Sequence, residues 1–100
     1  MIIVLGSVRI AATAVDAALA LAQVHVARSR SEPGCLEHGV HRDAEDPGRL
    51  VFVERWADRV ALDAHFRVPA SRAFVREIAA LAVAPPQMAL YDADALPGPL

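Results

Sequence analysis

The stretch Leu50-Val51-Phe52-Val53-Glu54-Arg55-Trp56 decides the fold, because it is a strand pattern with large apolar groups on both faces. Alternation places one set of side chains on each face: Leu50, Phe52, Glu54 and Trp56 against Val51, Val53 and Arg55. Residues 35–42 predict a preceding strand, and the polar, turn-rich residues 43–48 join the two into a hairpin. Both faces of the resulting sheet therefore need a cover.

A strand and a helix are predicted before the hairpin. Residues 2–10 carry β-branched side chains at both odd and even positions. This pattern indicates a strand that is buried on both faces. Thr13 and Asp16 have the spacing of a capping box, and the apolar residues after them recur every three or four positions. The predicted helix should end before Pro33-Gly34, where proline disfavours helical geometry and glycine suits a chain reversal.

Two helical segments and a strand are predicted after the hairpin. Asp58 is a candidate N-cap for a short helix that contains His65. Pro69 can start a further helix that runs to about Leu81. Residues 87–92 then predict the last strand.

The predicted order β-α-β-β-α-β is that of an α+β, ferredoxin-like split βαβ fold with a four-stranded antiparallel sheet. We expect a single domain over residues 1–100, with residues 93–100 as a flexible tail. The helices cover one face, yet two strands carry large apolar groups on both. Burial of apolar surface stabilises a protein by about 25 cal/mol per Å². Exposing several hundred Å² of this face to water would therefore lose several kcal/mol of stabilisation. The sequence therefore predicts a homodimer packed sheet on sheet, as a dimeric α/β barrel.

Charge and composition exclude several classes of partner. Ten basic residues, all of them Arg, stand against 12 Asp plus Glu, so the net charge of -2 argues against nucleic acid. No apolar run is long enough to span a membrane. The single cysteine, Cys35, cannot form an intramolecular disulfide, and no leader pattern opens the chain, so we expect a cytoplasmic protein.

Four blocks in this order resemble the antibiotic biosynthesis monooxygenase family, including its quinol monooxygenase branch. They are Ser29-Arg30-Ser31-Glu32-Pro33-Gly34-Cys35-Leu36, Asp46-Pro47-Gly48-Arg49, Glu54-Arg55-Trp56 and Ala64-His65-Phe66. The resemblance covers about residues 1–93. It implies a ferredoxin-like dimer with a pocket between sheet and helices, and oxygenation of a phenol or quinol by molecular oxygen without metal, flavin or haem. After the His, the run Val68-Pro69-Ala70 lacks the polar residues that relatives often carry there.

Within that resemblance His65, Trp56 and Glu54 are the candidate catalytic residues. His65 would be the base that makes an electron-rich phenolate, or would be a helix histidine that caps or hydrogen-bonds structurally. Trp56 would stack on the substrate, with its indole N–H free to donate, or would simply be the largest core residue. Glu54 would orient His65 or form a salt bridge with an Arg. The substrate pocket would be lined by Phe52, Phe66 and Phe74.

The other chemistry-bearing residues have plainer interpretations. His38 and His41 are three apart on a strand and should point to opposite faces, so we predict no metal site. His25 is expected at the surface and Cys35 as a small buried residue. Arg55 should face away from Trp56, toward the dimer surface or solvent.

Two other functions stay open at this point. A dimeric module that binds an aromatic metabolite without catalysis would use the same apolar pocket. Haem binding and degradation is disfavoured, because the chain contains no Asn and the haem-degrading relatives pair an Asn with the Trp and the His.

Overall fold

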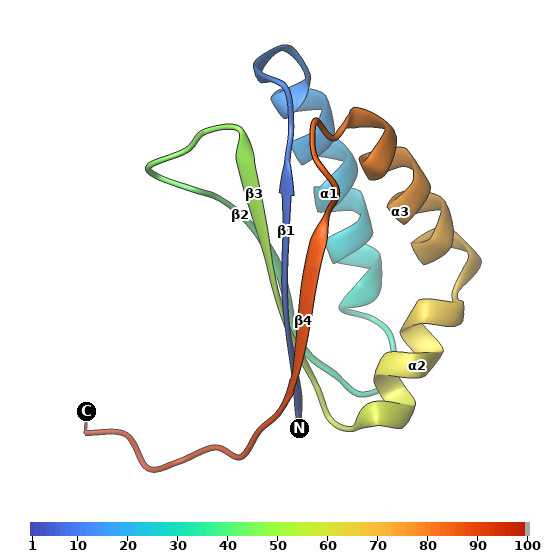
Figure 1. Cartoon of the computed structure of the whole chain (residues 1–100). Coiled ribbons are helices and arrows are strands. Elements are labelled where there is room, and N and C mark those ends of the chain that lie inside the picture. Colours follow the sequence, from blue (N-terminus) through green and yellow to red (C-terminus); the bar gives the residue numbers. More distant parts are fainter. Residues whose placement is uncertain (100) are drawn as a thin grey trace.

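The computed structural model describes residues 1–99 and has the predicted β-α-β-β-α-β order (Figure 1). The elements are β1 (Ile2–Arg9), the 3₁₀ turn η1 (Ala12–Ala14), α1 (Val15–Ser29), β2 (Cys35–Arg42), β3 (Arg49–Trp56), α2 (Arg59–Arg67), α3 (Pro69–Leu81) and β4 (Gln87–Asp92). The four strands lie in the order β2-β3-β1-β4, and each neighbouring pair is antiparallel. The ferredoxin-like architecture is thereby confirmed.

One predicted helix start is wrong. Thr13 and Asp16 do not form a capping box, because Thr13 lies in η1 and the N-cap of α1 is Ala14, without a side-chain hydrogen bond. The 3₁₀ turn replaces the cap, since the Ala14 N–H donates to the carbonyl of Ala11 at 2.9 Å. The other predicted cap is confirmed, because the carboxylate of Asp58 accepts from the N–H of Ala61 at 2.8 Å.

All the helices lie on one side of the sheet (Figure 1). On the inner face of β3, Leu50, Phe52, Glu54 and Trp56 are all buried, as the alternation predicts. The larger core cluster packs α1 and α3 on β1 and β3, and a smaller cluster of Val4, Trp56 and Leu62 holds α2. The two clusters leave α2 and α3 fixed above the middle of the sheet, where the cavity described below lies.

The outer face of the sheet carries apolar side chains and no helix. On this face Leu5 of β1 lies opposite Val53 of β3 and Ala89 of β4, and Ile3 of β1 lies opposite Tyr91 of β4. Leu5 is 44% exposed and Tyr91 52% exposed, although both belong to strands of the central sheet. We call this the outer sheet face. It has the apolar character that the sequence predicts.

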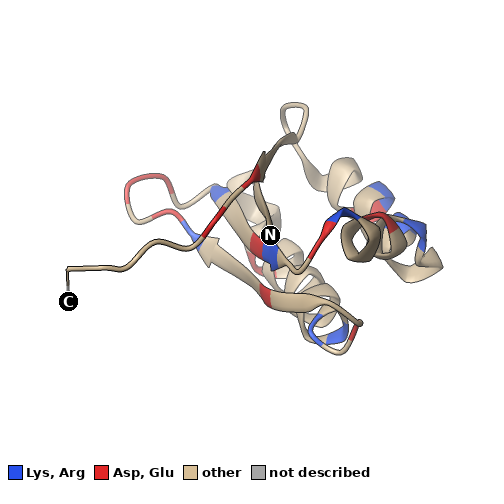
Figure 2. Cartoon of the chain, turned by 90° about the horizontal axis from the view of Figure 1, so that it is seen from below, with Lys and Arg blue, Asp and Glu red and all other residues tan. Residues whose placement is uncertain are grey.

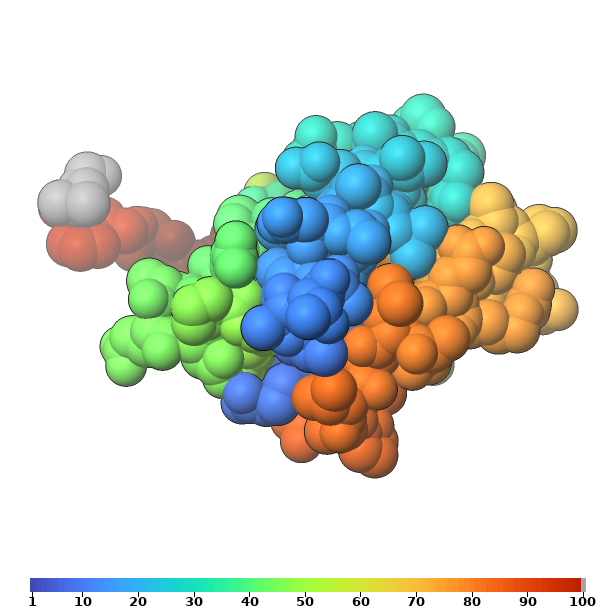
Figure 3. Space-filling view, turned by 90° about the horizontal axis from the view of Figure 1, so that it is seen from above, coloured from blue at the N-terminus to red at the C-terminus, as the bar shows by residue number. Residues whose placement is uncertain are grey.

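Charged residues of both signs are spread along the chain. Figure 2 shows Arg residues and acidic residues interspersed along the ribbon. Residues 93–99 have no regular structure and run away from the rest of the chain (Figure 3). Among residues 1–99, no helix has both the length and the hydropathy that crossing a bilayer requires.

Candidate functional site

A cavity of about 370 Å³ lies between the sheet and the helices. Its floor comes from β1, β3 and β4, and its roof from α1, α2 and α3. Most of its lining is apolar, and the few polar groups come from different elements. A small aromatic molecule fits the volume and lining of such a pocket. The predicted site residues that line it are Phe52, Glu54, His65, Phe66 and Phe74.

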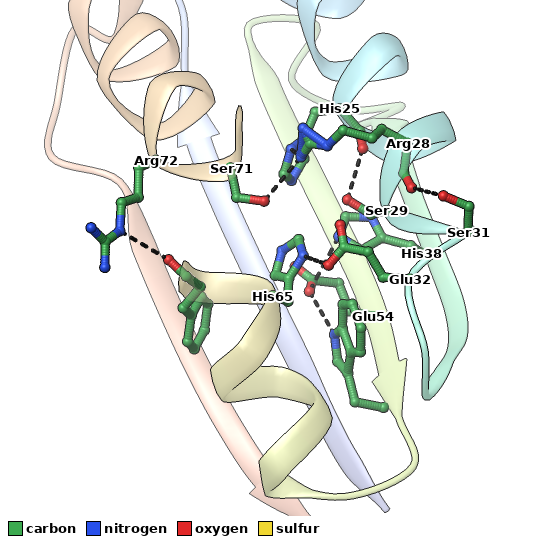
Figure 4. A network of polar contacts seen from close by, with 12 residues as sticks. His25, Arg28, Ser29, Ser31, Glu32, His38, Glu54, His65, Ser71 and Arg72 are labelled. Atoms are coloured by element: carbon green, nitrogen blue, oxygen red, sulfur yellow. Dashed lines mark hydrogen bonds and ion pairs between the residues drawn. The ribbon is translucent and has the colours of Figure 1, made fainter. Parts of the chain in front are cut away.

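His65 is held in one orientation by a carboxylate from another part of the chain. It lies on α2, and its Nδ1 is 2.9 Å from Oε1 of Glu32, in the turn between α1 and β2 (Figure 4). A carboxylate only accepts, so Nδ1 carries a proton, and the neutral form of the ring has its lone pair on Nε2. The His65 side chain is 4% exposed and lines the cavity. The arrangement is that of a base oriented by a partly buried acid.

Glu54 is a buried carboxylate that two neighbouring rings hold in the charged state. Its Oε1 accepts from the indole N–H of Trp56 at 2.9 Å and lies 3.2 Å from Nε2 of His38. Burial alone would raise the pKa of Glu54, but the contacts with His38 and Trp56 outweigh burial and hold the pKa below its usual value. The cavity therefore has an anion in its wall beside His65.

His25 enters the same region from α1. Its ring stacks on Phe74 with centroids 4.0 Å apart, and its Nδ1 is 2.7 Å from a guanidinium nitrogen of Arg28. Arg28 also donates to Oγ of Ser71 on α3 at 2.9 Å. Burial, then the charges of His38, His65 and Arg28, lower the pKa of His25 to about 3. His25 is thus a neutral ring at physiological pH.

Three imidazoles meet beside the cavity. The ring centroids of His25, His38 and His65 are 5.3, 5.4 and 5.5 Å apart, and all three side chains are buried. Figure 4 shows the three rings converging from α1, β2 and α2. The three residues offer one ring nitrogen each within 4.8 Å of one another. Neutral imidazole nitrogens at such separations are potential ligands for a transition-metal ion.

The structure changes the roles expected for Trp56 and Glu54. Trp56 is fully buried in the core and does not line the cavity, and its N–H is taken by Glu54, so the expectation of a free indole donor is wrong. The ring nevertheless lies 4.7 Å from that of His65, between centroids. Glu54 pairs with His38 and Trp56, and among residues 1–99 it forms no salt bridge with an Arg.

His25 was expected at the surface, and this expectation is wrong, since the residue is 7% exposed. A signal was present: the buried positions of α1 are Val15, Ala18, Ala22, His25, Val26 and Ser29, which follow one helical stripe. Glu32 was part of the motif block and had no assigned role. It reaches His65 only because the turn folds back onto α2, a contact 33 residues apart that no local pattern contains.

The remaining expectations concern residues outside the cavity. His38 is buried and His41 is exposed, so their opposite orientation is confirmed, but His38 joins two other histidines that spacing along the chain does not connect. Cys35 is half-buried against the smaller core cluster, and burial raises the pKa of its thiol. Arg55 faces away from Trp56 and contacts Glu37 at 2.6 Å.

Comparison with known proteins supplies a family. The model of the antibiotic biosynthesis monooxygenase family matches residues 1–77. A solved antibiotic biosynthesis monooxygenase is 35% identical, with a TM-score of 0.87 over 95% of this chain and 100% of that one. A Deinococcus radiodurans protein provisionally assigned to the same class is 23% identical and shares the fold, with a TM-score of 0.94 over 100% and 99% of the two chains.

A relative with a longer chain is also similar. An uncharacterized protein of Synechocystis sp. is 32% identical over 90 residues, which are 90% of this chain. The match spans 61% of that relative's length.

Proposed function

The chain belongs to the antibiotic biosynthesis monooxygenase family, and from this premise we propose that it oxidises a small phenolic or quinol aromatic with molecular oxygen. One observation carries the proposal. His65, oriented by Glu32 through Nδ1, lines an apolar cavity of about 370 Å³ with the Nε2 lone pair left as the basic atom. Cofactor-free oxidation of a phenol requires a base within an apolar, aromatic pocket.

His65 is the proposed catalytic residue. Its Nε2 takes the proton of the substrate hydroxyl and leaves an electron-rich phenolate. The imidazolium that forms lies between two carboxylates, since Glu32 contacts Nδ1 and Glu54 stands in the same cavity wall. These charges stabilise the imidazolium and hence proton transfer to His65. Trp56 and His38 act as positioning residues, because they hold the carboxylate of Glu54.

The rings of Phe52, Phe66 and Phe74 are the proposed walls for the substrate ring. The phenolate carbanion gives electrons to dioxygen, and a carbon–oxygen bond forms at the ring. The O–O bond then breaks, so that one oxygen atom remains in a quinone and the other leaves as water. For an anthrone, one molecule of substrate and one of dioxygen give one anthraquinone and one water, so the substrate is the only reductant.

The predicted cytoplasmic location stays a prediction. We also propose a homodimer that packs through the outer sheet face. The apolar outer sheet face supports the dimer, since Leu5 and Tyr91 are too exposed for a sheet that stays single. Each subunit keeps its own cavity, because the cavity lies on the opposite, helix-covered side of the sheet (Figure 1).

Oxygen uptake tests the oxidation. Purified protein is incubated aerobically with anthrone or a reduced naphthoquinol in an oxygen-electrode cell, and quinone is followed by absorbance. We expect His65→Gln to lower the rate above autoxidation by about 10²- to 10⁴-fold, the usual contribution of a general base. His41→Gln, which changes an exposed histidine of β2, is the matched control and should keep the full rate.

Three outcomes would count against the oxidation proposal. Equal oxygen uptake by wild type and His65→Gln would reduce the activity to autoxidation. Saturable binding of the aromatic compound without any uptake would favour the binding module. A stoichiometric haemin Soret shift that is lost in His65→Gln would instead favour the haem-binding alternative.

A further inference from the structure

Three histidines from three separate elements converge beside the cavity, and we infer that His25, His38 and His65 form a binding site for a divalent transition-metal ion such as Zn²⁺ or Co²⁺. Imidazole nitrogen is a ligand that these ions prefer. The inference does not depend on the proposed oxidation, because it rests on the geometry of nitrogen atoms and not on a reaction.

The separations suit a common ion after a small closure. One ring nitrogen from each histidine lies within 4.8 Å of the other two, and the centroids form a nearly equilateral triangle. Two nitrogens bound tetrahedrally at 2.0–2.1 Å from zinc are about 3.4 Å apart. The longest separation must therefore shorten by at most about 1.4 Å, which rotation of the side chains can supply.

We assign to the ion the ring nitrogens that the surrounding side-chain contacts leave unused. Nδ1 of His65 faces Glu32, so Nε2 is the free atom of that ring. His38 has a completely buried side chain, and neither of its ring nitrogens has a hydrogen-bond partner among the described residues. Its Nε2 lies 3.2 Å from Oε1 of Glu54 without the geometry of a hydrogen bond, so Nδ1 is the nitrogen with no charged neighbour at that distance. Buried polar atoms without partners are rare and costly in folded proteins. A metal ion on Nδ1 of His38 would give one of these two atoms a partner.

The surroundings also provide the charge and the fourth position that a metal ion needs. Glu32 contacts His65, and Glu54 lies 3.2 Å from Nε2 of His38, so two ligand rings have a carboxylate on their other nitrogen. Carboxylates in this place orient metal-bound histidines and raise their basicity. His25 and His65 line the cavity, so the open coordination position faces it. Three histidines with an open position form a site that accepts water or an outside ligand.

Arg28 opposes binding of a metal ion, and this gives the proposed site a specific test. Its guanidinium can only donate, so at 2.7 Å from Nδ1 of His25 it keeps the ring proton on Nε2, the atom that faces away from it. The ion must displace that proton to Nδ1 and loosen the contact with Arg28, against the repulsion of a like charge. Replacing Arg28 by Gln would give Nδ1–H an acceptor and remove the charge, so metal binding should tighten.

Binding is measured on untagged full-length chain stripped with a chelator, at neutral pH. Zn²⁺ is titrated by calorimetry, and Co²⁺ is followed by its visible absorption bands, which report a site of low coordination number. We expect one ion per chain. His38→Gln should weaken binding by about 100-fold or more, while Arg28→Gln should tighten it by about 10-fold or more. Arg28→Lys, which keeps a charged donor, is the matched control and should not tighten it.

Controls separate this site from surface binding and from misfolding. His41→Gln should leave stoichiometry and affinity unchanged, because His41 is exposed on the same strand. Far-UV circular dichroism checks the fold; if His38→Gln does not fold, His25→Gln and Arg28→Gln take its place. Absence of one-to-one binding in the wild type, loss of binding in His41→Gln, or failure of Arg28→Gln to tighten it would overturn the inference.

The metal result and the oxidation result can be told apart. Bound metal occupies Nε2 of His65, the proposed base, so Zn²⁺ and proton abstraction compete for one atom. Metal binding without oxygen uptake by the stripped protein would leave the site in place and remove the oxidation. Oxygen uptake without metal binding would do the reverse.

Discussion

At the scale of single residues, burial decides the charge of His25. The ring lies between α1 and α3, stacked on Phe74, and its neighbours His38, His65 and Arg28 all disfavour a positive charge. In the folded chain its pKa falls to about 3, whereas the unfolded chain has the ordinary value of 6.5. Between these values the unfolded state binds the proton and the folded state does not.

This difference predicts how stability depends on pH. As pH falls below 6.5, protonation of His25 in the unfolded state favours unfolding by up to about 1.4 kcal/mol per pH unit. Glu54, whose pKa is lowered, adds loss of stability in the same direction, but only below 4.5, the ordinary pKa of a glutamate side chain. Urea unfolding of wild type and His25→Gln between pH 7.5 and 5 should show a shallower decline in the variant.

His41→Gln is the control for the pH experiment, since His41 is exposed on β2 and should leave the slope as it is in the wild type. The interpretation of His25 as a buried neutral ring would be wrong if wild type and His25→Gln lost stability in parallel over this range.

The candidate site could be predicted from sequence only in part, and the limit is physical. Alternation along β3 puts Glu54 on the inner face with Phe52 and Trp56. The partner of Glu54 depends on the register of the hairpin, and a bulge between Cys35 and Glu37 shifts that register. Pairing of His38 with Glu54 therefore needs the folded hairpin, and so do the contacts of His25 and Glu32 across elements.

At the scale of elements, the bounds of β2, β4 and α3 agree with the sequence, because the chain itself marks them. Pro69 begins α3, and the turn before Cys35 contains Pro33 and Gly34. The start of α1 has no such marker, and a 3₁₀ turn takes the place of the predicted cap. Local chemistry thus predicts the boundaries that need special backbone angles, and packing decides the others.

Gly34 joins the turn, α2 and the site. Its φ is +80°, and an added Cβ would lie 2.5 Å from Cβ of Ala61 on α2. Gly34→Ala therefore combines backbone strain with overpacking, and we expect a loss of about 2–4 kcal/mol in the free energy of unfolding. Urea unfolding followed by Trp56 fluorescence measures this loss. The same turn carries Glu32, so the contact of Glu32 with His65 depends on this close packing.

Gly98→Ala is the matched control, because nothing lies within 4 Å of its added Cβ and its φ is not positive. Its free energy of unfolding should stay within about 0.5 kcal/mol of wild type. Equal stability of Gly34→Ala and wild type would show that the turn can relax away from α2.

At the scale of the whole molecule, the layers are one-sided. The helices and the cavity occupy one face of the sheet, and the outer sheet face has no cover within residues 1–99 (Figure 1). The inner face of the sheet therefore holds the candidate site, and the outer sheet face is the surface through which we propose that two copies associate. A second copy is the simplest cover for such a face, because two identical faces form a closed two-fold pair.

Charge placed on the outer sheet face should separate that pair. Leu5 pairs with Val53 and Ala89 on the neighbouring strands, and in a dimer its side chain would be removed from water. Leu5→Asp would bury an unpaired carboxylate there, which costs far more than the apolar contact gains. Light scattering after gel filtration should give two 10.7 kDa chains for wild type and one for Leu5→Asp. Val24→Asp, at an α1 position 71% exposed, should stay dimeric; a single-chain mass for wild type at micromolar concentration would contradict the proposed assembly.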